Sequence, residues 1–454
     1  MVSRNPYTGQ VLEELEAMGF EESVREIQGA RRAFLSWKKA SVQERAGTLR
    51  AVSKRLRDQQ RTFAETITRE MGKPIGQSLA EIEKCAWLSD YFADNAGKLL
   101  QDEMVETDAL KSYVALEPLG IILGIMPWNF PFWQVFRFAV PALMAGNVCV
   151  LKHASNVPQT ALAVEKIFRD SGLPDHVFKT LLVDSQVAMQ LVERELVDGV
   201  SLTGSVDAGA EVASLAGRHI KKFVLELGGS DPFIVLEDAD IPKTARMALQ
   251  ARMINSGQSC IAAKRFIALG AIAKSFTEAL EKELGSLKAG DPMDPTTTIG
   301  PLAKREFVGV LSAQLEDAER KGARVVYGPP PPSGKGFFFR PAIVTNVRPD
   351  MRVVTEEVFG PILPVLVAEN EARLVEMANA SVYGLGASIW TRDLARAEKL
   401  ARELEAGFVA VNDVVKSDPR LPFGGIKKSG VGRELSHYGL KEFMNIKSVV
   451  IKGA

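Results

Sequence analysis

The chain has 454 residues, a formal net charge of +0 at pH 7, 46% hydrophobic residues and 25% charged residues. This composition is typical of a globular enzyme and excludes a disordered or fibrous chain. The length is sufficient for two or three domains with a buried core each, and the balanced charge gives no indication of a nucleic-acid-binding surface.

Residues 1–100 are predicted to be mainly helical. The start, Met1–Pro6, lacks the apolar stretch and the small-residue cleavage site of a secretory signal, so a cytoplasmic location is expected. Charged and amphipathic stretches follow at Glu22–Ser36, Val42–Met71 and Gln77–Lys98. These helices are expected to cover one side of a sheet that forms later in the chain.

From about residue 116 to 236, strand-like apolar runs alternate with amphipathic helical stretches. The predicted strands are Leu119–Met126, Val148–Lys152, Phe178–Val183, Gly199–Leu202, Phe223–Leu227 and Phe233–Leu236. The predicted helices include Phe132–Met144, Pro158–Asp170 and Ala208–Ala216. This alternation predicts an α/β fold with a Rossmann-like parallel sheet covered by helices on both faces. Prolines and polar residues interrupt the apolar stretch 119–151, so no membrane span is expected.

A second α/β region is predicted after Asp238. It comprises a helix near Ile241–Ile254, a strand near Lys264–Leu269 and a helix at Ala273–Leu287. The stretch Gly328–Gly334 contains four consecutive prolines and is predicted to be an exposed loop between strands.

The three cysteines, Cys85, Cys149 and Cys260, are an odd number without metal-type spacing, so neither a disulfide framework nor a metal site is predicted. Cys260 directly follows Asn255–Ser259, whose small and polar residues can form a tight exposed turn. A thiol on such a turn can meet a substrate. Cys149 in an apolar strand and Cys85 on a helix are better explained as small buried hydrophobic residues.

Two polar residues at strand ends are candidates for catalysis. Glu226 ends an apolar strand just before two glycines, and burial would raise its pKa toward the range of a general base. A structural ion pair is the alternative. Asn129 lies between two prolines on irregular backbone, where a rigid amide can donate to an oxyanion or can merely cap a turn.

Together these motifs resemble the aldehyde dehydrogenase superfamily over nearly the whole chain, from Asn5–Gly9 to Gly432–Glu434. The matching segments are Pro127–Pro131, Thr203–Ser205, Glu226–Gly229, Gly257–Cys260, Glu356–Pro361 and Pro422–Gly425. The resemblance implies that the Cys260 thiolate attacks an aldehyde and that the Asn129 amide and the Cys260 N–H hold the oxyanion. After oxidation by a nicotinamide cofactor, Glu226 would activate the water that hydrolyses the thioester.

The resemblance also implies a cofactor site. Gly204 and Ser205 match positions at the pyrophosphate, where the free N–H groups of a helix start favour an anion. The other matching positions are Lys152 at the adenosine ribose, Glu357 at the nicotinamide ribose, Phe359 beside the nicotinamide, and Trp128. At Ser155 the chain lacks the glutamate typical of strictly NAD-using members. A 2′-phosphate would therefore meet no carboxylate there, and NAD or NADP is expected as the cofactor.

Arg137 indicates the substrate class. It follows Asn129 by eight residues in an aromatic helix, and members that oxidise succinate semialdehyde carry an arginine there that binds the distal carboxylate. Ser417 and Arg420 are candidates for further contacts, because Ile254 replaces a second arginine of many such members. The alternatives are an ion pair with a helix carboxylate for Arg137 and a surface position for Arg420. Lactaldehyde-type, glycolaldehyde-type and general aliphatic substrates also remain open.

The expected domains are a cofactor-binding domain (1–100 and 119–228), a catalytic domain (229–430) and a small β oligomerisation arm (101–118 and 438–454). Such arms pair exposed strands across subunits, so a homodimer or homotetramer is expected. A CoA-acylating enzyme is an alternative that Glu226 disfavours, because the glutamate serves hydrolysis. A non-enzymatic protein on this fold would be expected to lose Cys260 or Glu226, and both are present.

Overall fold

The first sheet of the protein lies in the N-terminal half of a computed structural model, which describes residues 1–334 and 336–453. Its order is β19-β9-β8-β5-β6-β7, with β19 the antiparallel edge strand and the others parallel. The strands are β5 (Ile121–Met126), β6 (Val148–His153), β7 (Phe178–Thr180), β8 (Gly199–Thr203), β9 (Lys222–Glu226) and β19 (Gly430–Val431). Nearly continuous apolar runs suit such strands, because both faces are covered by helices.

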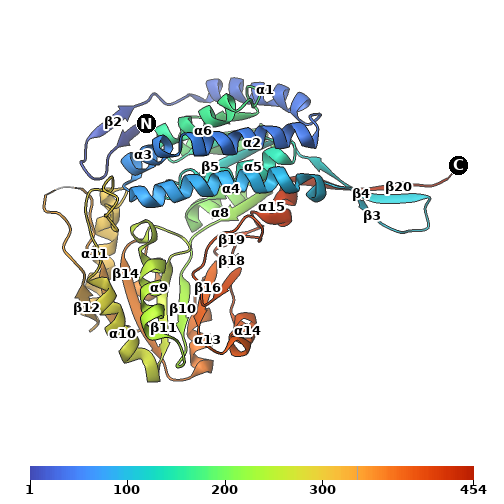
Figure 1. Cartoon of the computed structure of the whole chain (residues 1–454). Coiled ribbons are helices and arrows are strands. Elements are labelled where there is room, and N and C mark those ends of the chain that lie inside the picture. Colours follow the sequence, from blue (N-terminus) through green and yellow to red (C-terminus); the bar gives the residue numbers. More distant parts are fainter. Residues whose placement is uncertain (335, 454) are drawn as a thin grey trace.

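Eight helices of the described chain belong to this part. They are α1 (Phe20–Trp37), α2 (Val42–Asp58), α3 (Gln60–Met71), α4 (Ile75–Leu99), α5 (Trp133–Met144), α6 (Pro158–Asp170), α7 (Ser185–Glu193) and α8 (Val206–Arg218). The predicted stretch Val42–Met71 forms two helices that meet at Gln59, whose backbone angles are not helical. Figure 1 shows α4 running along the side of this unit that faces the second sheet.

The second sheet has the order β12-β13-β14-β11-β10-β16-β17. Its strands are β10 (Asp231–Val235), β11 (Ala263–Leu269), β12 (Arg324–Tyr327), β13 (Ala342–Thr345), β14 (Ile362–Ala368), β16 (Gly386–Trp390) and β17 (Phe408–Val411). Its helices are α9 (Ile241–Met253), α10 (Gly270–Leu284), α11 (Arg305–Arg320), α12 (Arg352–Thr355), α13 (Glu371–Asn379) and α14 (Leu394–Glu403). The described part of the stretch 328–334 connects β12 to β13, as predicted for a loop between strands.

One strand was assigned to the wrong sheet. The run Phe233–Leu236 was grouped with the strands of the first sheet, although the expected domain boundary at residue 228 puts it in the catalytic domain. In the structure, β10 pairs with β11 and β16 of the second sheet. Only residues 227–230 separate β9 from β10. A parallel crossover within one sheet needs a dozen or more residues, so this short connection leads directly to the other sheet.

A narrow arm projects from the body of the molecule (Figure 1). It consists of β3 (Glu103–Met104), β4 (Lys111–Pro118) and β20 (Met444–Ile451), all antiparallel. The predicted arm segment 438–454 begins inside the short helix α15 (Ser436–Glu442), so its strand starts at Met444. Apolar side chains of the arm, among them Met104 and Val450, are exposed in the single chain. No described helix is both long and apolar enough to cross a membrane.

The remaining short strands are β1 (Val2–Arg4) with β2 (Val11–Glu14) and β15 (Tyr383–Gly384) with β18 (Ile426–Lys427). The β15–β18 pair lies next to β19, which joins the C-terminal chain to the first sheet. Glu226 therefore ends β9 beside backbone from residue 430, close to the place where the two sheets meet.

Candidate active site

The turn before Cys260 has an unusual backbone. Asn255, Ser256 and Gly257 have φ values of 52°, 55° and 80°, so three successive residues adopt left-handed conformations. Such strain persists only where surrounding structure holds it. The Asn255 N–H donates to Gln77 Oε1 of α4 at 2.7 Å, and a Cβ on Gly257 would lie 2.4 Å from the Gly360 backbone. The turn is thereby fixed between α4 and the segment after Glu357.

Cys260 is half-buried at the end of this turn, whereas Cys85 and Cys149 are buried. Lys264 Nζ donates to the carbonyl oxygens of Ser259 and Cys260, at 2.8 and 2.7 Å. Burial raises the pKa of the Cys260 thiol to about 12, although Arg137 and Lys264 oppose the shift. The thiol is therefore protonated near neutral pH until a base or a nearby positive charge favours the thiolate.

Glu226 is buried and carries an unsatisfied carboxyl group. Within the described chain, neither carboxyl oxygen has a hydrogen-bond partner. The only cation within 4.0 Å among the described residues is Arg137, whose Nη2 lies 4.0 Å from Oε2. Burial raises the pKa of Glu226 well above its ordinary value, while Arg137 lowers it. The ionised form of such a carboxyl group is a stronger base toward water than a solvent-exposed carboxylate.

Asn129 is also buried, and its amide is oriented by two partners. Nδ2 donates to the Gln258 carbonyl at 3.1 Å, and Oδ1 accepts from Gln134 Nε2 at 3.0 Å. Gln258 precedes Cys260 by two residues, so the amide N–H group points toward the nucleophile turn. His153 supports the same loop through contacts with the carbonyls of Met126 and Pro131, at 3.2 and 2.9 Å.

The two glycines after Glu226 allow the catalytic segments to approach each other. A Cβ on Gly228 would lie 2.5 Å from Glu357 Oε2, and one on Gly229 would lie 2.6 Å from the Cys260 carbonyl oxygen. The Gly229 N–H donates to Glu357 Oε1 at 3.1 Å, and Lys264 Nζ lies 3.3 Å from the same oxygen. Glu357 is therefore held within a few ångströms of Cys260.

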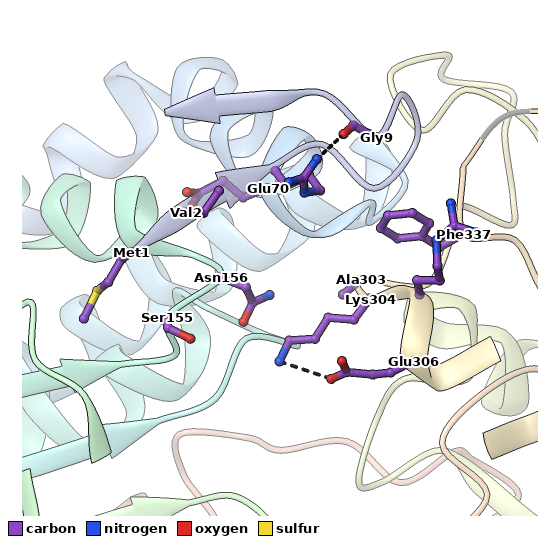
Figure 2. A pocket seen from close by; sticks show the side chains of 12 residues that line it. Met1, Val2, Gly9, Glu70, Ser155, Asn156, Ala303, Lys304, Glu306 and Phe337 are labelled. Carbon is purple, nitrogen blue, oxygen red and sulfur yellow. Dashed lines mark hydrogen bonds and ion pairs between the residues drawn. The ribbon is translucent and has the colours of Figure 1, made fainter. Parts of the chain in front are cut away.

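The predicted adenosine side of the cofactor site borders a pocket of about 670 Å³ (Figure 2). Ser155 and Asn156 follow β6 on one side of it, and Lys304 reaches toward them from the other. Both polar atoms of the Asn156 amide are buried without a hydrogen-bond partner in the described chain. Burial lowers the pKa of Lys152, which Asp184 raises and Lys304 lowers further. Lys304 is itself ion-paired with Glu306 at 3.4 Å. The unsatisfied Asn156 amide and these two lysines fit a polar ligand.

The residues predicted to contact the pyrophosphate and the nicotinamide leave room for a cofactor there. Ser205 caps α8, its side chain accepting from the Ala208 N–H at 3.3 Å, and a Cβ on Gly204 would touch only the Leu202 side chain. Anions bind at such helix starts. Trp128 meets Phe359 edge to face, with ring centroids 5.8 Å apart, so the two aromatic residues form one wall.

A second cavity, of about 230 Å³, contains the Cys260 side chain among its lining residues. Cys260, Arg137 and Ser417 all line it, and so do Ile254 and Lys84. Arg420 does not belong to its lining. Its side chain is exposed, bonds Asp418 at 2.6 Å and lies over the Trp87 ring, so its predicted contact with substrate gives way to the alternative of a surface arginine.

Arg137 lines the cavity but is not a free cation. Its Nε forms an ion pair with Glu434, and its Nη2 lies 3.4 Å from Thr203 Oγ1. Both side chains of the ion pair are almost fully buried. The partner is not the helix carboxylate that the sequence suggested, because Glu434 lies just before α15 and bridges to Phe423.

The Aldehyde dehydrogenase family profile matches residues 1–449 of the chain. The chain belongs to the aldehyde dehydrogenase family. Among its relatives is a protein of Synechocystis named probable succinate-semialdehyde dehydrogenase, NADP(+), 46% identical over 98% of both chains. An Escherichia coli succinate semialdehyde dehydrogenase, NAD(P)+, is 42% identical over 99% of this chain and 97% of its own.

A solved structure of a succinic semialdehyde dehydrogenase from Streptococcus pyogenes, in complex with NADP+, superimposes with a TM-score of 0.97. It is 36% identical and covers 100% of both chains. The predicted α/β class with a Rossmann-like sheet is thus confirmed for this aldehyde dehydrogenase.

Two residues of this aldehyde dehydrogenase site, Lys84 and Glu434, were not predicted from the sequence. Lys84 has a recognisable signal, because Gln77, Glu81 and Lys84 recur at helical spacing on a helix that is otherwise largely apolar on its buried side. All three side chains line the cavity beside Cys260. Glu434 carries no such signal, since its pairing with Arg137 joins segments far apart in the chain.

Proposed function

We propose that this chain oxidises succinate semialdehyde to succinate with NADP+ or NAD+. The observation that carries the proposal is the cavity that holds the Cys260 thiol together with the cationic and hydroxyl groups of Lys84, Arg137 and Ser417. A four-carbon aldehyde that ends in a carboxylate matches such a cavity in polarity. The names of the Synechocystis, Escherichia coli and Streptococcus pyogenes relatives support the same substrate.

In the proposed reaction the Cys260 thiol first loses its proton to solvent. The thiolate sulfur then forms a bond to the aldehyde carbon, and the carbonyl oxygen becomes an oxyanion. The Asn129 amide and the Cys260 N–H donate to that oxyanion and stabilise it. The nicotinamide ring supplies the acceptor for the hydrogen and the two electrons that leave the carbon. Cys260 then carries a thioester.

Glu226 completes the cycle by accepting a proton from a water molecule that attacks the thioester. The carbon–sulfur bond breaks, the acid leaves, and the Cys260 thiolate returns. Burial suits Glu226 to this task, because its raised pKa makes the carboxylate a stronger base than one in water. The pair Arg137 and Glu434 holds the carboxylate between fixed charges.

The proposed cofactor residues are Trp128, Lys152, Ser155, Gly204, Ser205, Glu357 and Phe359. Ser155 places no carboxylate against a 2′-phosphate on the adenosine side, and Lys152 provides positive charge nearby, while Lys304 is ion-paired with Glu306. NADP+ is therefore proposed as a usable cofactor beside NAD+.

Initial rates with succinate semialdehyde, lactaldehyde and butanal, each with both cofactors, test the proposed function. We expect kcat/KM to be highest for succinate semialdehyde, by about tenfold or more over butanal. Equal values for the three aldehydes would contradict the proposed substrate. A requirement for CoA, with no acid formed in its absence, would instead support the acylating alternative.

We also propose a cytoplasmic homodimer or homotetramer that assembles through the arm. The support is the exposed apolar surface of β3 and β20, including Met104, Val450 and Ile451, which pairing with another chain would cover. Analytical ultracentrifugation tests this assembly, and a monomer at micromolar concentration would contradict it.

A further inference from the structure

Lys84 is a half-buried cation that lines the cavity beside Cys260. It lies on α4, and its Nζ donates to Ser417 Oγ at 2.8 Å and sits 4.3 Å from the centre of the Trp133 ring. Ser417, Trp133 and Cys260 line the same cavity. The ammonium group and the nucleophile therefore share one enclosed space.

No carboxylate neutralises Lys84. Within residues 1–334 and 336–453, no acidic oxygen lies within 4.0 Å of its Nζ. The neighbouring acidic side chains are ion-paired with other cations. Glu81 is ion-paired with Lys73 and accepts from the backbone N–H groups of Phe132 and Trp133, both at 2.9 Å.

Asp418 is the other acidic neighbour, and it is held by Arg420. The two side chains make a 2.6 Å ion pair, with Arg420 Nε donating to the second carboxylate oxygen at 2.9 Å. Asp418 is therefore already paired and does not serve as the counter-charge of Lys84.

Arg137 differs from Lys84 in this respect. Its charge is balanced by Glu434, whereas the Lys84 ammonium contacts only a hydroxyl group and an aromatic ring. A partly buried ammonium without a counter-charge is less stable than a paired one, and an anion that enters the cavity would pair with it. A carboxylate of the substrate is such an anion.

We propose that Lys84, together with Ser417, binds the distal carboxylate of the aldehyde and sets the preference of the enzyme for carboxylated over uncharged substrates. The proposal deepens the proposed function and rests on it. In this arrangement the ammonium and the Ser417 hydroxyl both donate to the carboxylate, and the aldehyde end is directed toward Cys260. Arg137, whose charge is balanced by Glu434, provides hydrogen bonds to the substrate. Lys84 provides the net positive charge that attracts the substrate carboxylate.

Kinetics of the Lys84→Met variant test the proposal, because methionine has a similar length and no charge. With NADP+, we expect kcat/KM for succinate semialdehyde to fall about 10- to 100-fold, mainly through a higher KM. For butanal we expect a change of less than about threefold. Lys98→Met, at the exposed end of the same helix, is the matched control and should behave as the wild type.

The pH dependence gives a second readout that a structural role would not produce. Burial, followed by the charge of Arg137, lowers the pKa of Lys84 to about 8, while Cys85, Glu81 and Asp418 raise it. The ammonium is thus charged below about pH 8 and neutral above it. The ratio of kcat/KM for succinate semialdehyde to that for butanal should fall as the pH rises through 8. In Lys84→Met this ratio should not change with pH.

Inhibition by succinate gives a further test that does not depend on how much of the variant folds, because an inhibition constant is measured on the active fraction alone. Succinate should compete with butanal in the wild type and in Lys98→Met, and its inhibition constant should rise about tenfold or more in any active Lys84→Met fraction. A Lys84→Met enzyme that keeps the substrate ratio, its pH dependence and succinate inhibition would overturn the role of Lys84. A wild type without any preference for succinate semialdehyde would overturn the proposed function itself.

Discussion

The Arg137 Nη2 atom lies 4.0 Å from the Glu226 carboxylate, while Nε of the same guanidinium is ion-paired with Glu434. The proposed general base, Glu226, is thus held beside a cation that is also ion-paired with Glu434. Since Glu226 has no hydrogen-bond partner within the described residues, this electrostatic contact is the main interaction that limits the rise of its pKa. Arg137 therefore links the substrate cavity to the hydrolytic step.

The buried pair can be tested by removing one or both charges. Arg137→Met leaves Glu434 buried without its partner, and should lower the free energy of unfolding by about 3–5 kcal/mol. The double variant Arg137→Met/Glu434→Gln should recover part of this loss. Urea denaturation measures both effects, and an unchanged stability of the single variant would contradict the ion pair.

Cofactor choice should depend on Ser155. A carboxylate in Ser155→Glu would face the 2′-phosphate of NADP+, and two like charges at close range cost about 1–4 kcal/mol depending on exposure. We expect the Michaelis constant for NADP+ to rise about tenfold or more and that for NAD+ to change little. Ser36→Glu on α1 serves as the control for an added surface charge. Equal effects on both cofactors would place Ser155 away from the phosphate.

Stability should fall in acid because of His153. Burial lowers the pKa of this imidazole from an ordinary 6.5 to about 4, so the folded protein holds it neutral where the unfolded chain is protonated. The contribution of the neutral imidazole to the free energy of unfolding is complete above pH 6.5 and is lost as the pH falls toward 4. The shift corresponds to roughly 3 kcal/mol. His153→Gln should show a smaller decrease between pH 6.5 and 4.5 in denaturant titrations, and an identical decrease would contradict this.

Alkylation should distinguish the three cysteines. With its pKa raised to about 12, Cys260 should react slowly with iodoacetamide at pH 7, and the rate should keep rising with pH beyond 9. Cys85 and Cys149 are buried and should remain unmodified in the folded protein. Peptide mass analysis checks both expectations, and a rate that levels off near pH 7 would show that Cys260 is already a thiolate.

Local sequence patterns predicted most of the elements well, because the strands of the first sheet are nearly continuous apolar runs and α5 is mostly apolar and buried around its whole circumference. Strand β10 was assigned to the wrong sheet because a run of apolar residues carries no information about its neighbours. The length of the connection that precedes it, residues 227–230, decides the sheet.

The candidate site was less predictable where it depends on distant partners. The resemblance identified Cys260, Glu226 and Asn129 as candidates, and the structure brings them to one region through α4 and the strained turn at Asn255. The sequence did not show which of the cations near the site would be paired with a carboxylate. Arg137 is neutralised by Glu434, Arg420 by Asp418, and Lys84 by neither, and these pairings arise only in the folded chain.

Trapping the covalent intermediate tests the central claim most directly. In Glu226→Gln the thioester should form but hydrolyse slowly, since only the second half of the reaction needs the base. After mixing with succinate semialdehyde and NADP+, we predict a burst of about one NADPH per active site. Mass spectrometry should then find one succinyl group on the peptide that contains Cys260. A burst without an adduct on that peptide, or an adduct on Cys85 or Cys149, would contradict the account.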